Sequence, residues 1–190
     1  SVPQPAPKRF VPRIRDEMRV DAPFLVGQLG KSAFQLVDAR AADRYRGENE
    51  TIDPVAGHIP GALNRFWGLN LGSDGKFKSG AALAAEFKSL LGARGPGSVV
   101  HSCGSGVSAC HNLLAMEIAG LPGAMLYPGS WSEWIADKSR AIATGGMFNV
   151  LHLGNLVKLD FIVRKDTPYR RHEFERRRRV PMPGFEAWIV

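Results

Sequence analysis

Cys103 stands between a run of apolar and β-branched residues and a glycine-rich segment, where a thiol can serve as a nucleophile. Residues 98–102 predict a buried strand, residues 104–108 a turn, and residues 109–119 carry apolar side chains at helical spacing. A thiol at the carboxyl end of such a strand faces backbone N–H groups and the positive end of a helix dipole. Both favour the thiolate, which is the reactive form. The sequence therefore predicts a cysteine nucleophile at the end of a strand.

Four motifs resemble those of rhodanese-type sulfurtransferases, and they occur in the family's order over about residues 16 to 145. They are CGSGVS at 103–108, LVDAR at 36–40 followed by Arg44, GHIPGA at 57–62, and GSWSEW at 129–134. The Gly-Ser-Gly-Val core of the first motif is most similar to the 3-mercaptopyruvate sulfurtransferase branch. The resemblance implies an α/β, rhodanese-like fold with a mainly parallel sheet and helices on both faces, which alternating strands and helices also favour.

The resemblance also implies a reaction. Cys103 would take sulfur from a small anionic donor, 3-mercaptopyruvate or thiosulfate, hold it as a persulfide, and pass it to a thiol or cyanide. Ser105 would polarise the donor's carbonyl or relay a proton. No metal and no organic cofactor is implied. We expect the substrate-binding residues to be Arg44, Gly104, Gly106, Val107 and Ser108, and the supporting residues to be Asp38, Arg40, His58, Ser130 and Trp131.

General chemistry supports these roles and leaves alternatives open. Glycines let a loop turn tightly enough to aim its N–H groups at an anion, and the Arg44 guanidinium can bind two oxygens at once. The alternatives are a surface ion pair for Arg44 and a hydrogen bond within its own turn for Ser105. We expect His58 to fix its own loop, and the second cysteine, Cys110, to lie in the core.

Two departures from the family pattern bear on the choice of donor. Residues 48–54 contain no arginine, where some members carry a second carboxylate-binding one, and Arg65 is the candidate replacement. In two-domain sulfurtransferases a non-catalytic amino-terminal repeat supplies part of the wall of the site. We expect residues 14–145 to be the catalytic half alone, preceded by a proline-rich extended linker at residues 1–13.

Local patterns predict the elements of this domain. We expect helices at residues 24–29, 81–91 and from 109, strands at 34–38, 99–103 and 124–127, and a long loop from 39 through 61.

Residues 146–190 form a basic extension with nine Lys and Arg against five Asp and Glu. Strands at 148–153 and 156–163, joined by Gly154-Asn155, predict a hairpin, and residues 168–179 a basic helix. The stretch resembles a nucleotidyltransferase-like fragment in which Asp160 would match a metal-binding carboxylate. The other carboxylates that two-metal chemistry needs are absent, so we expect no catalysis from Asp160.

Composition and spacing exclude several other classes of protein. The 190-residue chain carries a net charge of +7, but its tail has no base-reading motif, so a solvated helix face is favoured over nucleic-acid binding. Two cysteines make no disulfide framework, and no run approaches the ~18 apolar residues of a membrane span. With no signal peptide, we expect a cytoplasmic protein.

Two other functions are alternatives to sulfur transfer. A cysteine phosphatase needs a Cys-x5-Arg loop, and Ala109 stands where that arginine would be. A catalytically weak rhodanese module used for binding or regulation, with its basic tail contacting nucleotide or nucleic acid, is the alternative function. Such modules usually lose the cysteine, and Cys103 is present.

Overall fold

The computed structural model describes residues 9, 11–12 and 15–144, together with the backbone of strands at 147–152, 157–162, 178–182 and 185–189. Its central sheet has four parallel strands in the order β2-β1-β3-β4. These are β1 (Gln35–Asp38), β2 (Leu63–Asn64), β3 (Val99–Ser102) and β4 (Met125–Leu126). The parallel sheet confirms the expected α/β architecture, and all residues of β1 and β3 are buried.

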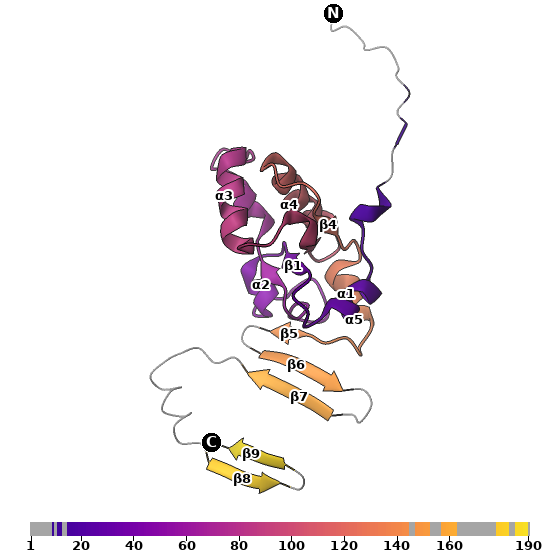
Figure 1. Ribbon diagram of the computed structural model, residues 1–190, viewed down its shortest axis with the longest axis vertical. Helices are drawn as coiled ribbons and strands as arrows, with labels where there is room; N and C mark the ends of the chain where they lie inside the picture. Colours follow the sequence, from indigo (N-terminus) through magenta and orange to yellow (C-terminus); the bar gives the residue numbers. More distant parts are fainter. Residues whose placement is uncertain are drawn as a thin grey trace, which may run out of the picture.

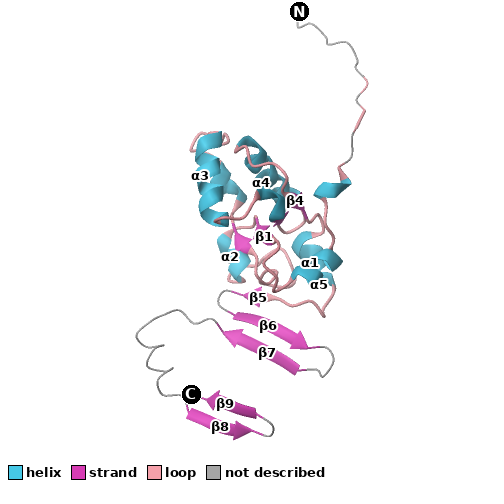
Figure 2. Ribbon diagram, in the orientation of Figure 1, coloured by secondary structure: helices cyan, strands magenta, loops and turns pink. Residues whose placement is uncertain are grey.

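Helices cover both faces of this sheet (Figure 1; Figure 2). Strand residues that alternate in direction build two cores: Leu36 and Val100 pack on one face, Val37 and Val99 on the other. The first core includes residues of α1 (Ala22–Gln28) and α5 (Ser130–Ala136), and the second those of α3 (Gly80–Leu91) and α4 (Val107–Ile118). Because both faces of the sheet are covered, even polar strand residues such as Asp38 and His101 are buried.

Capping residues mark the helix ends that the sequence predicts. The Ser79 hydroxyl accepts a hydrogen bond from the Ala82 amide at the start of α3, and Gly92 follows its last residue. At α1, the Asp21 carboxylate accepts one from the Phe24 amide. The predicted helices at 24–29 and 81–91 are thereby confirmed to within two residues.

The differences from prediction concern short or shifted elements. The predicted loop from 39 through 61 contains a helix, α2 (Ala42–Arg46), and α4 begins at Val107 rather than at Ala109. Helices of five to seven residues show too few turns for periodicity and form through tertiary contacts. Three 3₁₀ turns complete the domain: η1 (Asp16–Met18), η2 (Trp67–Asn70) and η3 (Pro96–Ser98).

A second, antiparallel sheet continues from the domain into the extension. It joins β5 (Ala143–Thr144), β6 (Met147–His152) and β7 (Val157–Ile162), which confirms the predicted hairpin. Ala143 also bridges His58 of the main domain, so the ladder continues across the predicted boundary at residue 145. That boundary stays a prediction.

The last strands, β8 (Arg178–Met182) and β9 (Phe185–Ile189), form a separate pair. The predicted basic helix at 168–179 lies outside the described residues except for its last two positions, which belong to β8. Most of the predicted linker at 1–13 likewise lies outside the described residues.

Candidate active site

Cys103 directly follows β3 and lies at the carboxyl end of the parallel sheet, where α/β proteins place their ligand sites. The residue is only 2% exposed, and it packs against Ala39, which follows β1, and Ala109 in the first turn of α4. The strand–turn–helix order predicted around the thiol is therefore present.

The start of α5 holds the loop in place through its backbone and one side chain. The Trp131 amide donates to the Cys103 carbonyl over 3.0 Å, and the Ser132 amide to the Gly104 carbonyl over 2.9 Å. In return, the Cys103 amide donates to the Ser130 hydroxyl, also over 3.0 Å. Ser130 is fully buried with a φ of +52°, in the left-handed region that non-glycine residues rarely adopt. The GSWSEW motif thus fixes the CGSGVS motif.

The loop between Cys103 and α4 carries backbone donors without partners. Gly106, at the amino end of α4, has a φ of +85°, and a Cβ there would overlap the Pro128 carbonyl oxygen, so only glycine fits. Within the described part of the chain, the amides of residues 104–108 donate no hydrogen bond. These N–H groups are able to bind an anion beside the thiol.

Cys103 lines a cavity of about 260 Å³, together with three other residues of its loop: Gly104, Ser105 and Ser108. Gly106 and Val107 do not line it, and the Val107 side chain points outward with 76% of its surface exposed. The other lining residues are Arg40, Ala41, Arg44, Ile52, Asp53, Phe66, Trp67 and Ser132.

Arg44 reaches this cavity from α2 and is held by two carboxylates. Its Nε donates to both Glu50 oxygens over 3.0 and 3.1 Å, and its Nη2 contacts Glu50 Oε1 and Asp53 Oδ2, each over 2.9 Å. The Arg44 side chain is 18% exposed. The ion-pair alternative for Arg44 is therefore present, but beside the cavity rather than on the open surface.

Behind Arg44, a buried network supports the cavity wall. Arg40 donates to the Asp38 carboxylate over 2.7 Å and to the Gly57 carbonyl over 2.7 Å, and its guanidinium lies 4.9 Å from the ring centre of Trp131. Glu50 Oε2 lies 3.5 Å from Arg40 Nη1, so this carboxylate joins the two arginines.

Glu50 remains ionised within this network. Burial by itself raises the pKa of Glu50, but hydrogen bonds from the Asp53 and Ile52 amides and from Arg44 outweigh it, so the pKa is lowered. Asp38, Arg40 and Trp131 thereby take supporting places around the site, and of these only Arg40 lines the cavity.

His58 has a structural place. Its Nδ1 lies 2.7 Å from the Tyr45 carbonyl oxygen, and its ring stacks on Tyr45 with centroids 3.7 Å apart. Burial lowers the pKa of His58, although the Tyr45 carbonyl opposes that shift. His58 does not line the cavity, in agreement with its expected role in fixing its own loop.

Two expectations are wrong. Arg65 bonds Asn70 over 3.0 Å and Glu86 over 2.7 Å, and its guanidinium lies over the ring of Phe87, so it does not line the cavity. Cys110 is exposed rather than in the core, because it lies on the outward side of α4.

Sequence reasoning missed the acidic side of the cavity. Asp53 and Ser132 both line it, and Glu50 holds Arg44. The available signal was the pair of acidic residues, Glu50 and Asp53, six and nine residues after Arg44.

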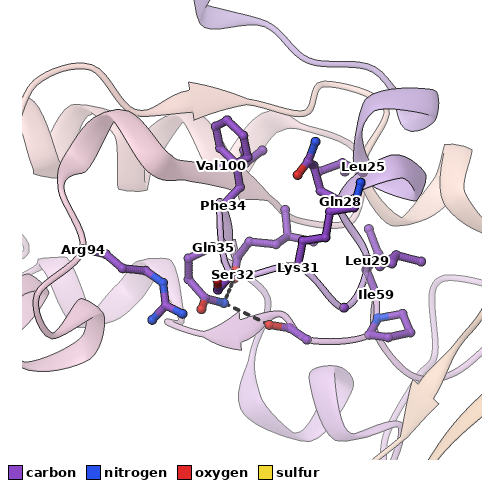
Figure 3. A pocket seen from close by; sticks show the side chains of 14 residues that line it. Leu25, Gln28, Leu29, Lys31, Ser32, Phe34, Gln35, Ile59, Arg94 and Val100 are labelled. Carbon is purple, nitrogen blue, oxygen red and sulfur yellow. Dashed lines mark hydrogen bonds between the residues drawn. The ribbon is translucent and has the colours of Figure 1, made fainter.

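A larger cavity of about 320 Å³ lies at the opposite, amino end of the strands (Figure 3). The Gln35 amide donates there to the carbonyls of Leu36 and Gly61. Among the described residues, no thiol, imidazole or carboxylate lines this cavity, and its polar side chains include those of Lys31 and Ser32. In the described residues no three His, Cys, Asp or Glu side chains are grouped as metal ligands.

Comparison with known proteins decides the family. Residues 22–137, more than half of the chain, match the family model of the Rhodanese-like domain. The chain belongs to the rhodanese-like family. This rhodanese-like domain is 54% identical over 126 residues to a probable 3-mercaptopyruvate sulfurtransferase of Pseudomonas aeruginosa, covering 66% of the chain and 44% of that relative.

Two vertebrate relatives are more distant. The domain is 36% identical to human 3-mercaptopyruvate sulfurtransferase, over 69% of the chain and 44% of that protein. It is 33% identical to thiosulfate sulfurtransferase of Gallus gallus, over 69% of the chain and 45% of that protein. The chain thus spans less than half the length of these relatives.

Solved structures agree on the fold of the rhodanese-like domain. An anaerobic ergothioneine biosynthesis enzyme from Chlorobium limicola, solved with trimethyl histidine, aligns with a TM-score of 0.60 at 23% identity, over 69% of this chain and 33% of that one. A variant of EanB with hercynine aligns with a TM-score of 0.62 at 24% identity, over 74% and 36%. Along the described part of the chain, no helix combines the length and the apolar character needed to cross a membrane.

Proposed function

We propose that this rhodanese-like domain is the catalytic domain of a sulfurtransferase that carries a sulfane sulfur as a persulfide on Cys103. The observation that carries the proposal is that Cys103 and Arg44 line the same cavity, while the amides of the loop after Cys103 donate no hydrogen bond within the described residues. Relatives named 3-mercaptopyruvate and thiosulfate sulfurtransferase support the same reaction.

The reaction has two displacements. The Cys103 thiolate attacks the outer sulfur of thiosulfate or the thiol sulfur of 3-mercaptopyruvate, and an S–S bond to Cys103 forms. With 3-mercaptopyruvate the C–S bond breaks, and the carbon takes a proton to give pyruvate; with thiosulfate the S–S bond breaks and sulfite leaves. A thiolate or cyanide then attacks the outer sulfur, which releases the Cys103 thiolate and gives a new persulfide or thiocyanate.

The surrounding groups act on charge and position. Amides of residues 104–108 stabilise the anionic persulfide without reorganising, because the loop is already held by α5. Arg44 orients the anionic end of the donor. Ser105 lines the cavity, and its hydroxyl is our candidate for polarising a donor carbonyl or relaying a proton.

The class of donor follows from the branch. The 54% identity to a probable 3-mercaptopyruvate sulfurtransferase favours that donor, with thiosulfate as the second. A thiol acceptor is available in a reducing compartment, so we also propose a cytoplasmic setting.

Intact-protein mass tests the proposal. The protein is incubated with 3-mercaptopyruvate, and separately with thiosulfate, beside Cys103→Ser and Cys110→Ser variants. We expect a gain of one sulfur that cyanide removes, unchanged in Cys110→Ser and absent in Cys103→Ser. A folded wild-type protein that gains no sulfur from either donor would overturn the proposal and favour a binding or regulatory module.

A further inference from the structure

We propose that Asp53 is a specificity-determining residue of this site: its carboxylate competes with the donor's anionic group for Arg44 and must be displaced when the donor binds. The inference rests on the proposed function, since it concerns how the same cavity accepts an anionic donor. It predicts that Asp53 weakens the binding of anions and leaves uncharged molecules unaffected.

The position of Asp53 is that of a competitor. Its Oδ2 lies 2.9 Å from Arg44 Nη2, and an ideal Cβ on Gly104, next to the nucleophile, would lie 3.8 Å from the same oxygen. The Asp53 side chain is 10% exposed and lines the Cys103 cavity. Asp53 therefore lines the same cavity as Arg44 and occupies the Nη2 group that a donor anion would use.

The second contact of Asp53 is weak. Its Oδ1 lies 3.2 Å from the Ser132 hydroxyl, which lies only 2.8 Å from the Gly104 carbonyl oxygen. One hydroxyl hydrogen serves one acceptor well, and the shorter contact takes it. Asp53 is thus held mainly by Arg44, which is the bond that a donor anion would replace.

Glu50 differs from Asp53 in each of these respects. It contacts both Arg44 and Arg40 and accepts hydrogen bonds from the amides of Ile52 and Asp53 over 3.0 Å each. Its side chain is 3% exposed, and it does not line the cavity. Glu50 is therefore a positioning residue for Arg44, whereas the Asp53 carboxylate can be displaced from Arg44 by a donor anion.

The balance of charge explains the expected effect. Two guanidiniums, of Arg40 and Arg44, face three carboxylates, of Asp38, Glu50 and Asp53, within one bonded network. With the Cys103 thiolate added, an incoming anion meets a surplus of negative charge. Neutralisation of Asp53 lowers that surplus by one charge, and its departure from Arg44 frees one contact of Nη2, to which a carboxylate or sulfonate-like oxyanion can bind.

Binding is measured by calorimetry in the Cys103→Ser background, which cannot turn over the donor. The probes are 3-mercaptopyruvate, pyruvate as its sulfur-free anion, and pyruvamide as an uncharged analogue of pyruvate. We expect Asp53→Asn to bind both anions about tenfold more tightly, with no change for pyruvamide. Glu50→Gln, the matched control, is expected to bind the anions more weakly because Arg44 loses its support.

If Asp53 competes with the donor, Asp53→Asn binds anions more tightly. If Asp53 only positions Arg44, the same variant binds them more weakly. Weaker or unchanged anion binding in Asp53→Asn overturns the inference, and so does an equal gain for pyruvamide. Absence of anion binding to both the parent and Asp53→Asn also overturns it, because Asp53 is then not what opposes the anion. Asp53→Ser serves as a second variant if Asp53→Asn does not fold. Persulfide formation on the wild-type protein tests the proposed function separately, because that experiment depends on Cys103 and uses no Asp53 variant.

Discussion

The Cys103 amide donates a hydrogen bond over 3.0 Å to the hydroxyl of Ser130, 27 residues further along the chain. That hydroxyl in turn donates to the Tyr127 carbonyl over 2.9 Å. Ser130 has a φ of +52°, so a strained residue links Cys103 to the end of β4 and the start of α5.

Two substitutions at Ser130 separate its hydrogen bonds from its backbone strain. Ser130→Ala leaves the buried Cys103 amide and Tyr127 carbonyl unpaired and keeps the strain, so we expect a loss of about 1–3 kcal/mol in unfolding free energy. Ser130→Gly loses the same bonds but relieves ~1–2 kcal/mol of strain. Urea unfolding of both variants checks this order. A glycine variant less stable than the alanine variant would contradict it.

Gly106 offers a test of the loop's geometry. Gly106→Ala meets both a φ of +85° and overlap with the Pro128 carbonyl, so we expect a loss of roughly 3 kcal/mol or more and slower persulfide formation. Gly30→Ala is the matched control, because Gly30 has a φ of +72° with nothing within 4 Å. It should lose only about 1–2 kcal/mol. Equal losses in urea unfolding would mean that the overlap at Pro128 has no cost.

Arg44 is expected to act through the shape of its guanidinium as well as its charge. Arg44→Lys keeps the charge but loses the planar fork, so we expect KM for 3-mercaptopyruvate to rise about tenfold, with a smaller change in kcat. Arg46→Lys is the control on the same helix, since Arg46 is 44% exposed and pairs with Glu48. Steady-state kinetics of both variants check this. The same rise in KM for both would assign the effect to α2 rather than to Arg44.

His101 predicts how stability depends on pH. Burial lowers the pKa of His101 to about 3, whereas the unfolded chain protonates it near its ordinary value of about 6.5. The unfolded state therefore binds the extra proton between these values. The contribution of His101 to the unfolding free energy is fully present above pH ~6.5 and falls by about 1.4 kcal/mol per pH unit below it.

Replacement of His101 should remove its share of the pH dependence of stability. We expect the wild-type protein to lose about 2 kcal/mol from His101 between pH ~6.5 and pH ~5, and His101→Leu to lose correspondingly less. His58 and His111, whose pKa values burial also lowers, account for part of the slope that remains. Urea unfolding at several pH values measures the difference. Parallel slopes for the two proteins would contradict the neutral, buried state of His101.

Local sequence determined the elements around Cys103. The β-branched residues of β3, the glycines after Cys103 and the apolar spacing of α4 are patterns within about twenty residues, so strand, turn and helix could be predicted. The amino-terminal ends of α1 and α3 could also be predicted, because the nearby side chains of Asp21 and Ser79 cap them. The four motifs together predicted the rhodanese-like fold, which the family match confirms.

Only the tertiary structure decided what surrounds these motifs. Ser130 and Ser132 reach the loop because α5 packs beside it, and α5 itself is too short to show a period. Arg44 pairs with Glu50 and Asp53 because the chain after α2 folds back over the cavity. Such contacts depend on long-range packing rather than on local propensity. The sequence therefore predicted Cys103 and Arg44 as site residues, while the fold decided which carboxylates pair with Arg44.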